Sequence, residues 1–460
     1  MSSQCFLLAK PADSWKSDGL DSTEIKQQVQ SGVARHRRKA WKVAQAVHRF
    51  SEPPLKEHQS SQLLAEYLRE NDFTVTFPYR DLPTAFRAVW GKGKPTLGML
   101  GEYDALPNCG AEEGTWGHGC GHNLLGSAPA LGAVVVRDIL EQQKIPGRIV
   151  YYGCPAEETL VGKVYMAREG AFRDLDACLA WHPSTTTGVN VFGGAAMDSI
   201  LFEFSGRTAH GSSAHNGRSA LDGAMLFDVA VNYLREHVPE NIRLHGVIRS
   251  GGDAPNVVPA YAKCWYYVRG KDREEVDAVR ERVLDCARGA ALATGTEVNW
   301  TILTTVTERI PNHTLGDLVH QNLRHFGPPR PTKADRDRVR THLTLKPEFD
   351  TTVREGRGQQ GRGSTEEDNV SWFTPLGRFQ MTCYVKETAG HHRDLAAQVD
   401  FPFAERAMAQ TAKVFAASAL DLFTQPTQLQ NARKEFRRRG KGKTYPDLIP
   451  KKQKPPSANP

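Results

Sequence analysis

Strand-like and helix-like segments alternate along the N-terminal half of the chain, and this order restricts the folds that the chain can adopt. Short β-type runs predict strands over 73–76, 85–90, 96–100, 148–154 and 177–181. Apolar residues at helical spacing predict helices over 22–48, 60–71 and 124–142. Strands that alternate with helices are typical of parallel sheets covered by helices. The order therefore predicts an α/β domain with a central, mostly parallel sheet flanked by helices.

A second pattern begins near residue 198, with elements in the order β-α-β-β-α-β. The expected strands cover 199–205, 242–249, 262–268 and 297–304, and the expected helices cover 219–236 and the stretch around 276–287. This split βαβ order is long enough to form a domain of its own. Helical patterns over 315–326 and 402–422 then resume the first domain. We therefore expect a discontinuous larger domain (22–194 and 308–425) and an inserted α+β domain (195–307).

Two segments lack the patterns of packed structure. The segment 327–363 is rich in Arg, Asp, Gly, Pro and Thr, which predicts a long surface loop or a partly disordered stretch. The last segment, 426–460, is expected to be a basic, disordered tail.

The positive charge of the chain is concentrated in this tail. Residues 431–460 hold ten Lys or Arg and two Asp or Glu, which gives +8; because the whole chain carries +7, the other residues sum to −1. No nucleic-acid partner is therefore expected. The alternative is binding of nucleic acid through the tail, which predicts a salt-dependent affinity that is lost when 431–460 is deleted.

The cysteines and the apolar segments indicate in which cellular compartment the protein is expected. Eight cysteines are scattered with no paired spacing, which in a chain of 460 residues argues against a disulfide scaffold and for a reducing compartment. No apolar run approaches the ~20 residues that span a bilayer. Residues 1–11 lack the features of a signal peptide. We expect a cytoplasmic protein with no membrane partner.

A glycine-rich run, Gly-His-Gly-Cys-Gly-His-Asn at 117–123, carries a thiol and an imidazole two residues apart. Its glycines allow the backbone to fold tightly around an ion that Cys120 and His122 could share. Two further groups come at strand ends: an acidic pair at 157–158, and His182. In an open α/β sheet, side chains at the carboxyl ends of successive strands lie near one another.

Each of these features has an ordinary explanation when it is taken alone. A single Cys-x-His is more often incidental than a ligand pair, an acidic pair is usually solvated, and His182 could be a hydrogen-bonded core histidine. Their occurrence in this order at successive strand ends favours a hydrolytic metal site. In such a site, one of Glu157 and Glu158 would coordinate and the other would act on water.

A longer series of motifs resembles one family. It comprises Gly-Glu-Tyr-Asp-Ala-Leu-Pro (101–107), the run at 117–123, Pro-Ala-Glu-Glu (155–158), Trp-His-Pro (181–183), Gly-Arg-Thr-Ala-His (206–210), Gly-Arg-Ser-Ala-Leu-Asp (217–222), Pro-Asn-Val-Val-Pro (255–259) and Val-Arg (268–269). This ordered set resembles the aminoacylase/carboxypeptidase superfamily of two-metal hydrolases, peptidase family M20. The resemblance points to the amidohydrolase branch, which includes p-aminobenzoyl-glutamate hydrolases and aminoacylase-like Xaa-Arg dipeptidases.

The resemblance implies a role for each matching residue. In the larger, catalytic domain, the implied metal ligands are Cys120, His122, Glu158, His182 and His391. Glu157 would be the general base, and Asp104 would orient a ligand histidine. The inserted domain would be a lid and dimerisation domain, from which His210 reaches the partner subunit's active site and polarises the scissile carbonyl. Asn256 and Arg269 would contact the substrate carboxylate. Without the resemblance, His210 could simply bond a loop and Asn256 could be a turn residue.

Two departures from the family pattern lie near the last ligand. Glu366 and Asp368 stand where relatives tend to have Asp and Gly, and Glu387 replaces a family glycine. They bear on the local geometry around His391. His391 is favoured over His392 as the last ligand because the residues before it align best with the family pattern.

The resemblance implies a homodimeric, metal-dependent amidohydrolase or dipeptidase. It would bind two divalent ions per subunit, Zn²⁺ or Mn²⁺, and cleave an amide bond next to a free carboxylate. The expected substrates are N-acyl amino acids, aminobenzoyl-glutamate-like conjugates and dipeptides. The alternative is a catalytically idle protein that binds an amino-acid conjugate. Metal content separates the two, because the idle protein would hold no ions.

Overall fold

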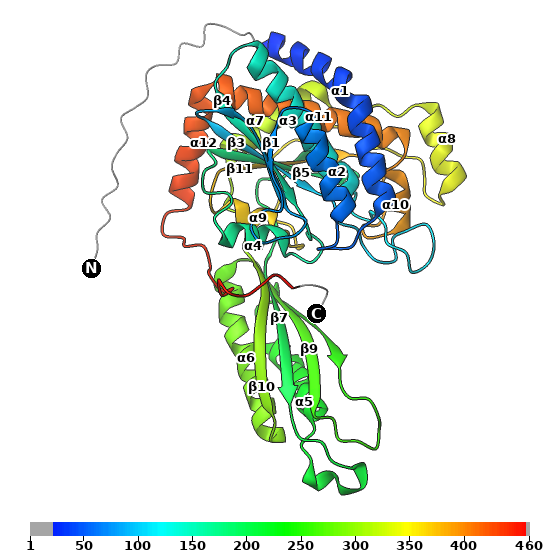
Figure 1. Cartoon of the computed structure of the whole chain (residues 1–460), viewed down its shortest axis with the longest axis vertical. Coiled ribbons are helices and arrows are strands. Elements are labelled where there is room, and N and C mark those ends of the chain that lie inside the picture. Colours follow the sequence, from blue (N-terminus) through cyan, green and yellow to red (C-terminus); the bar gives the residue numbers. More distant parts are fainter. Residues whose placement is uncertain (1–21, 457–460) are drawn as a thin grey trace, which may run out of the picture.

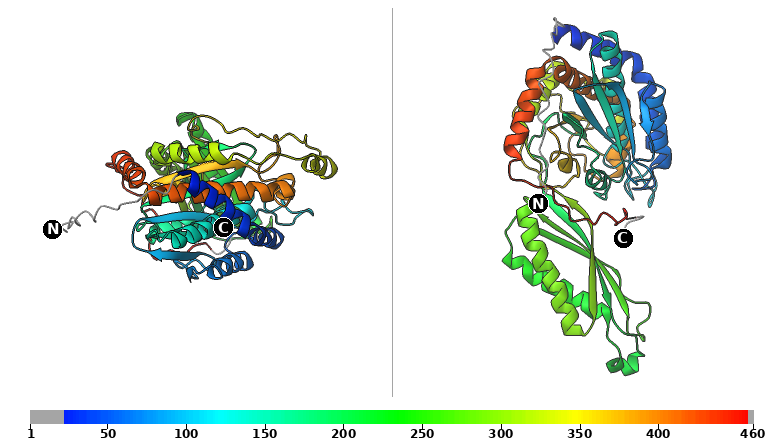
Figure 2. Two further views of the ribbon diagram at one scale, coloured as in Figure 1. Left: turned by 90° about the horizontal axis from the view of Figure 1, so that it is seen from above. Right: turned by 60° about the vertical axis from the view of Figure 1, so that its left-hand side comes forward.

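The computed structural model describes residues 22–456 and has two structural units. The larger unit is built from both ends of the described chain, and the smaller unit, formed by its middle, projects from one side (Figures 1 and 2). The predicted α/β class with an inserted α+β domain is confirmed. Residues 1–11, where no signal peptide is expected, and residues 457–460 of the expected tail lie outside the described residues.

Seven strands form the sheet of the larger unit, in the order β1-β2-β4-β3-β5-β11-β6. They are β1 (Thr74–Thr76), β2 (Phe86–Lys92), β3 (Thr96–Glu102), β4 (Gly147–Cys154), β5 (Ala177–Ser184), β6 (Gly188–Val189) and β11 (Leu376–Thr382). The four central strands β4, β3, β5 and β11 are parallel, whereas β1, β2 and β6 pair antiparallel at the two edges.

The sheet is therefore mixed: its central strands are parallel, as expected, and its edge strands are antiparallel. A parallel pair needs a crossover of about a dozen residues or more, usually a helix. The connections 77–85 and 93–95 are too short for that, so the strands that they join run in opposite directions.

Successive side chains of the central strands point into two different cores, because the side-chain period of a strand is two. In β4, Ile149 and Tyr151 join one core, and Val150 and Tyr152 join the other. The first core is covered by α1 (Ser22–Phe50), α2 (His58–Arg69), α3 (His122–Gln142), α7 (His313–Phe326) and α11 (Pro402–Thr424). The second core is covered by α4 (Gly162–Arg168) and α9 (Glu367–Val370).

Helix α3 packs between α1 and α11 and against β3. Among the described residues it is the one helix long and apolar enough to cross a membrane by length and composition, and 89% of that stretch is buried inside the protein. A helix that is apolar on all sides is expected where it is covered on all sides.

The inserted unit has the predicted β-α-β-β-α-β order. Its main elements are β7 (Ala196–Ser205), α5 (Ala220–Leu234), β8 (Arg243–Ser250), β9 (Tyr261–Gly270), α6 (Arg273–Thr294) and β10 (Glu297–Val306), with short 3₁₀ turns η1 (Gly211–Asn216) and η2 (Arg235–His237). The antiparallel sheet has the order β10-β7-β9-β8, which leaves β8 at one edge. Helix α5 packs against this sheet through Phe227, which contacts Phe202 and Tyr266, and α6 packs against it through Val276 and Val283.

The strand registers fix which end of the inserted unit adjoins the larger one. β7 begins and β9 ends beside the larger unit (Figure 1). Ala196 pairs with Gly270 at that end of the two strands, and Ser205 pairs with Tyr261 at the opposite end. The loops 206–219 and 251–260 therefore lie at the far end of the inserted unit.

The expected disordered tail is wrong for most of its length. Residues Pro426–Arg439 form α12, which packs against α7 and α11 with Leu429 and Ala432 buried. The segment that follows lies along the junction of the two units (Figure 1), where Ile449 is buried and Gln453 Nε2 donates to the Ile302 carbonyl of β10 at 2.8 Å. Contacts with residues distant in sequence order this segment despite its polar composition.

The segment 327–363 also contains more structure than its composition predicts. It includes α8 (Lys333–His342), which begins with a capping box. The Thr332 hydroxyl accepts from the backbone N–H of Asp335, and the Asp335 carboxylate accepts from the backbone N–H of Thr332. A capping box stabilises a helix start through local bonds alone. Most of the rest of the segment is neither helix nor strand, and near its end Gln360 Nε2 donates to the Lys271 carbonyl of the inserted unit at 2.8 Å.

Candidate metal centre

The candidate site lies at the carboxyl ends of the central strands. β3 ends at Glu102, and Asp104 follows two residues later. Glu157 and Glu158 follow the end of β4, and His182 lies in β5 near its end. Because these three strands are parallel, their carboxyl ends lie at the same edge of the sheet.

Two further donors come from the glycine-rich loop. α3 begins at His122, two residues after the loop residue Cys120. A Cβ atom on Gly119 would lie 2.5 Å from Cys109 Sγ, so the loop can pass here only without a side chain. The backbone N–H of His391 donates to the Gly119 carbonyl at 2.9 Å. This bond holds the last predicted histidine against the cysteine loop.

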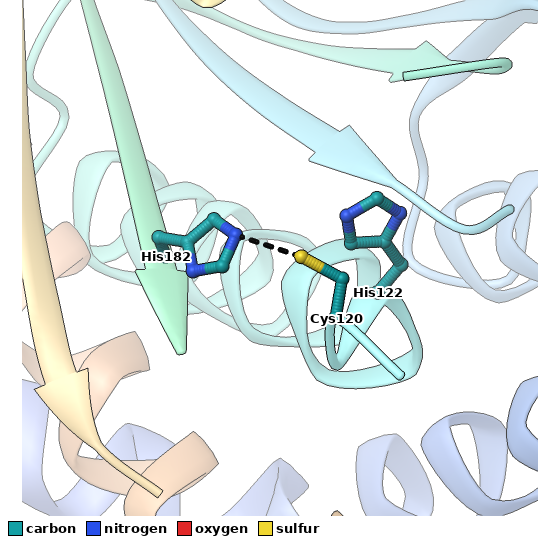
Figure 3. Close-up of side chains that lie close together, drawn as sticks. All are labelled: Cys120, His122 and His182. Atoms are coloured by element: carbon teal, nitrogen blue, oxygen red, sulfur yellow. Dashed lines mark hydrogen bonds between the residues drawn. The ribbon is translucent and has the colours of Figure 1, made fainter. Parts of the chain in front are cut away.

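The predicted ligands fall into two groups that share Cys120. Figure 3 shows Cys120, His122 and His182 with their side chains close together, and Cys120 Sγ lies 3.2 Å from His182 Nε2. The donor atoms of these three residues all lie within 4.8 Å of one another. The same limit holds for Cys120, Glu158 and His391. The five residues are therefore close enough to share bound ions.

Two of the histidine rings are held by their Nδ1 atoms. His122 Nδ1 donates to Asp104 Oδ1 at 2.8 Å, and His182 Nδ1 donates to the Pro183 carbonyl at 2.6 Å. The second carboxylate oxygen of Asp104 accepts from the backbone N–H of Glu158 at 2.9 Å. Each Nε2 atom is thus left with its lone pair for a ligand, which is the arrangement that metal-binding histidines use.

Two buried donor atoms without hydrogen-bond partners indicate whether this site suits an ion. His122 Nε2 and Glu158 Oε1 are both buried and have no hydrogen-bond partner among the described residues. An unpartnered polar atom is costly to bury, so such atoms call for a ligand. Thiolate, imidazole and carboxylate donors together suit a divalent transition ion. The residues therefore fit a divalent metal ion.

The carboxyl groups of the site crowd one another. Burial raises the pKa of Glu157 well above its usual range, and Glu102 and Glu366 raise it further. Burial also raises the pKa of Glu158 to about 7. For His182, burial lowers the pKa to about 4, and Arg378 contributes. The cluster favours a bound cation, since a cation would offset this repulsion.

Sequence reasoning missed a buried lysine beside the site. Lys163 of α4 is fully buried, and its Nζ lies 2.6 Å from Glu102 Oε1 and 3.2 Å from Glu366 Oε1. The pairing gives the departure at Glu366 a physical reason, because the longer acid meets a buried cation. A lysine in an otherwise apolar segment, soon after the acidic pair, was the available signal.

The departure at Asp368 is compensated in the same way. Asp368 Oδ1 accepts from Arg309 Nε at 2.6 Å, and the neighbouring Glu367 accepts from Arg378 Nε at 3.0 Å. Sequence reasoning missed both arginines, because their partners lie on other elements. No contact in the described part of the chain ties Glu387 to the donors.

A cavity of about 430 Å³ connects the donors to the inserted unit. Its lining includes Cys120, Glu157, His391, Arg309, Tyr267 and Arg269. Arg269 comes from β9, and its buried Nε has no hydrogen-bond partner among the described residues. Its other two nitrogens contact the Arg362 carbonyl and Met197 Sδ, so the guanidinium has no carboxylate partner among the described residues and faces the same space as the candidate metal ligands.

The structure does not bring His210 and Asn256 to this cavity. Both are exposed at the far end of the inserted unit, where Gly211 N donates to the Asn256 carbonyl at 2.7 Å. His210 Nδ1 accepts from the Ser212 backbone at 3.2 Å, which leaves its Nε2 unused. The two residues are neighbours, but they lie away from the donors of their own chain.

The two adjacent histidines of the last motif have different positions. His391 Nε2 lies 3.6 Å from Glu158 Oε2. His392 is the N-cap residue of α10 (Arg393–Gln398), and its Nδ1 accepts from the backbone N–H of Asp394. The geometry therefore favours His391 as the ligand.

Comparison with known proteins places this chain in a family. Residues 191–294 match the model of the peptidase dimerisation domain. The chain is 32% identical over 475 residues to one of the subunits of p-aminobenzoyl-glutamate hydrolase from Escherichia coli, and the match covers 94% of this chain and 99% of the relative. It is 27% identical over 447 residues to Xaa-Arg dipeptidase of Mus musculus, covering 94% and 96%.

A solved structure shows the same fold. A dinuclear metal-binding peptidase of the M20 family from Bacillus subtilis has a TM-score of 0.57 at 17% identity, covering 85% of this chain and 99% of that one. The resemblance expected from the motifs is confirmed. The chain belongs to the M20 peptidase family and is a hydrolase of peptide or amide bonds.

Proposed function

We propose that this chain is a metal-dependent amidohydrolase that cleaves an amide bond next to a free carboxylate. The observation that carries the proposal is the meeting, in one cavity, of a donor cluster, the adjacent acid Glu157 and Arg269, whose buried Nε has no partner among the described residues. The donor cluster supplies a site for ions, Glu157 supplies a base, and Arg269 supplies a partner for a carboxylate.

Each residue has a part in the proposed reaction. Divalent ions held by Cys120, His122, Glu158, His182 and His391 would supply Lewis acidity for the water and the scissile carbonyl. Glu157 takes a proton from the attacking water and passes it to the leaving amine. Asp104 holds the His122 ring in its binding orientation. Arg269 pairs with the substrate carboxylate and so places the amide beside Glu157.

We propose two divalent ions per subunit, Zn²⁺ or Mn²⁺, because the donor set divides into two overlapping groups. We also propose a cytoplasmic location. In the described part of the chain all seven cysteines are free, as a reducing compartment would keep them. A reduced Cys120 is required for the thiolate ligand.

The proposed enzyme is a homodimer in which His210 and Asn256 complete the partner's site. All the large exposed apolar side chains in the described chain belong to the inserted unit, and α5 carries Met225, Leu226, Val229 and Tyr233 among them. Helix α5 contacts β8, whose outer edge pairs with no other strand among the described residues. An apolar helix face beside an open sheet edge is expected to be covered by another chain.

The names of the relatives suggest which amides to test. A suitable panel contains N-acyl amino acids, aminobenzoyl-glutamate and dipeptides with a basic C-terminal residue, each beside its carboxyl-amidated form. We expect metal-loaded protein to cleave at least one free-acid substrate, and a chelator to abolish that activity until metal is restored. A protein that binds such conjugates but holds no metal and cleaves none of them would instead be the catalytically idle alternative.

A further inference from the structure

A second cavity, of about 520 Å³, adjoins the one that holds the donors. Arg269 and Gly361 line both cavities. The second cavity carries more positive than negative side chains: its lining includes Arg243, Arg269, Lys271, Arg362 and the single acid Glu240. Four cations against one carboxylate leave a surplus of three positive charges.

Two of these arginines are neighbours on adjacent strands of the sheet. Arg243 on β8 and Arg269 on β9 are direct cross-strand partners, so their side chains project from the same face. Like charges in this arrangement destabilise a sheet unless something compensates them. Neither forms an ion pair with a carboxylate of the described chain; Arg243 donates to the backbone carbonyls of Glu240 and Ile242.

The third arginine comes from a different part of the chain. Arg362 precedes the Glu366 region, and its carbonyl accepts from Arg269 at 3.4 Å. No carboxylate in the described residues pairs with its guanidinium either. Lys271 differs, because Asp272 and Glu275 lie within ion-pair distance of its Nζ. The unbalanced charge of the cavity therefore belongs to the three arginines.

We propose that Arg243, Arg269 and Arg362 form a second anion subsite, which selects amides whose leaving amino acid carries two carboxylates, as glutamate and aspartate do. This inference rests on the proposed function. Arg269 lines both cavities, so a carboxylate beside it lies between the donor cluster and the other two arginines. A side-chain carboxylate only a few carbons away is then directed into the second cavity, where guanidinium groups favour carboxylate geometry.

The kinetic test uses two substrates that differ in one charge, N-benzoyl-glutamate and N-benzoyl-glutamine. Wild-type enzyme is expected to favour the glutamate amide about tenfold or more in kcat/KM, as for charge-assisted contacts worth ~1.5 kcal/mol or more. In the double variant Arg243→Gln/Arg362→Gln this ratio is expected to fall toward one. The control is Arg282→Gln, an exposed arginine of α6 that also donates to a backbone carbonyl and lines neither cavity.

A binding measurement keeps the inference testable without turnover. Glutarate and butyrate differ by one carboxylate, and calorimetry on metal-loaded wild type is expected to show glutarate binding about tenfold more tightly. Cleavage of both amides with equal kcat/KM would overturn the subsite and leave the proposed function standing. A glutamate preference that persists in the double variant would also overturn it. Failure to cleave any amide, together with tighter binding of glutarate, would contradict the proposed function but not the subsite.

Discussion

At the scale of single residues, Asp104 links two candidate ligands through its two oxygens. One oxygen holds the His122 ring and the other holds the backbone of Glu158. We predict that Asp104→Asn weakens metal affinity by about 10–100-fold, the range seen when such supporting partners are lost. Competition with a chromogenic chelator measures it. Asp174→Asn, at a partly exposed ion pair with Arg87, is the control. Equal affinity in wild type and Asp104→Asn would contradict this role.

Lys163 supplies a buried ammonium group between Glu102 and Glu366. Its removal leaves buried carboxylates without this partner, so Lys163→Met is predicted to lower the free energy of unfolding by about 3–5 kcal/mol. Urea unfolding of metal-free protein measures the change. The double variant Lys163→Met/Glu366→Gln should recover part of the loss, because it removes one of the stranded charges. Wild-type stability in the single variant would refute the account.

At the scale of elements, Glu435 joins α12 to the start of α7. Its carboxylate accepts from the backbone N–H groups of His313 and Thr314 at 3.0 and 2.9 Å. Burial opposes the charged form, but these bonds prevail and lower the pKa of Glu435 to about 2. The stabilisation is therefore complete above the ordinary pKa of about 4.5 and is lost as the pH falls toward 2.

We predict that Glu435→Gln lowers the free energy of unfolding by about 1–2 kcal/mol at pH 7. The difference from wild type should shrink below about pH 4.5, where the carboxylate begins to take up a proton in the unfolded state while it stays charged in the folded state. Urea unfolding at a series of pH values measures both quantities. The exposed Glu141→Gln serves as the control. A difference that stays constant from pH 7 to pH 3 would show that the charge of Glu435 is not the cause.

Most elements were predictable because buried faces impose a period on the sequence. The strand expected over 148–154 is observed as Gly147–Cys154, and the helix expected over 402–422 as Pro402–Thr424. The central strand β11 was missed, since Arg378 and Gln380 interrupt its apolar run. Arg378 lines the cavity beside the candidate metal ligands, so a polar residue that serves the site interrupts the apolar pattern that would have predicted the strand.

Helix α12 was missed for a different reason. Only Leu429 and Ala432 are buried, and the rest of the helix is polar. Its position depends on distant partners, such as the ion pair of Arg433 with Asp176 at 2.8 Å. The same limit applies to the site. Its five donors lie in recognisable motifs, whereas the cations that balance Glu366 and Asp368 become visible only in the fold.

At the scale of the whole molecule, His210 lies at the far end of the inserted unit, away from the candidate metal ligands of its own chain. If His210 acts in the partner's site, mixing Glu157→Gln chains with His210→Ala chains should restore activity. A mixed dimer would hold one site with both residues intact, so about a quarter of wild-type activity is expected from random exchange of equal amounts. Subunit exchange must be verified separately. Full exchange without recovery would mean that His210 does not act across the dimer.

The central claim is that Glu157 moves the proton while its neighbours hold the metal. The most direct measurement is the Glu157→Gln variant, assayed for bound metal by mass spectrometry and for turnover of a cleaved amide. We predict metal content equal to wild type and a loss of kcat of about 10²–10⁴-fold, the usual contribution of a positioned general base. Turnover near the wild-type rate with full metal content would contradict the claim.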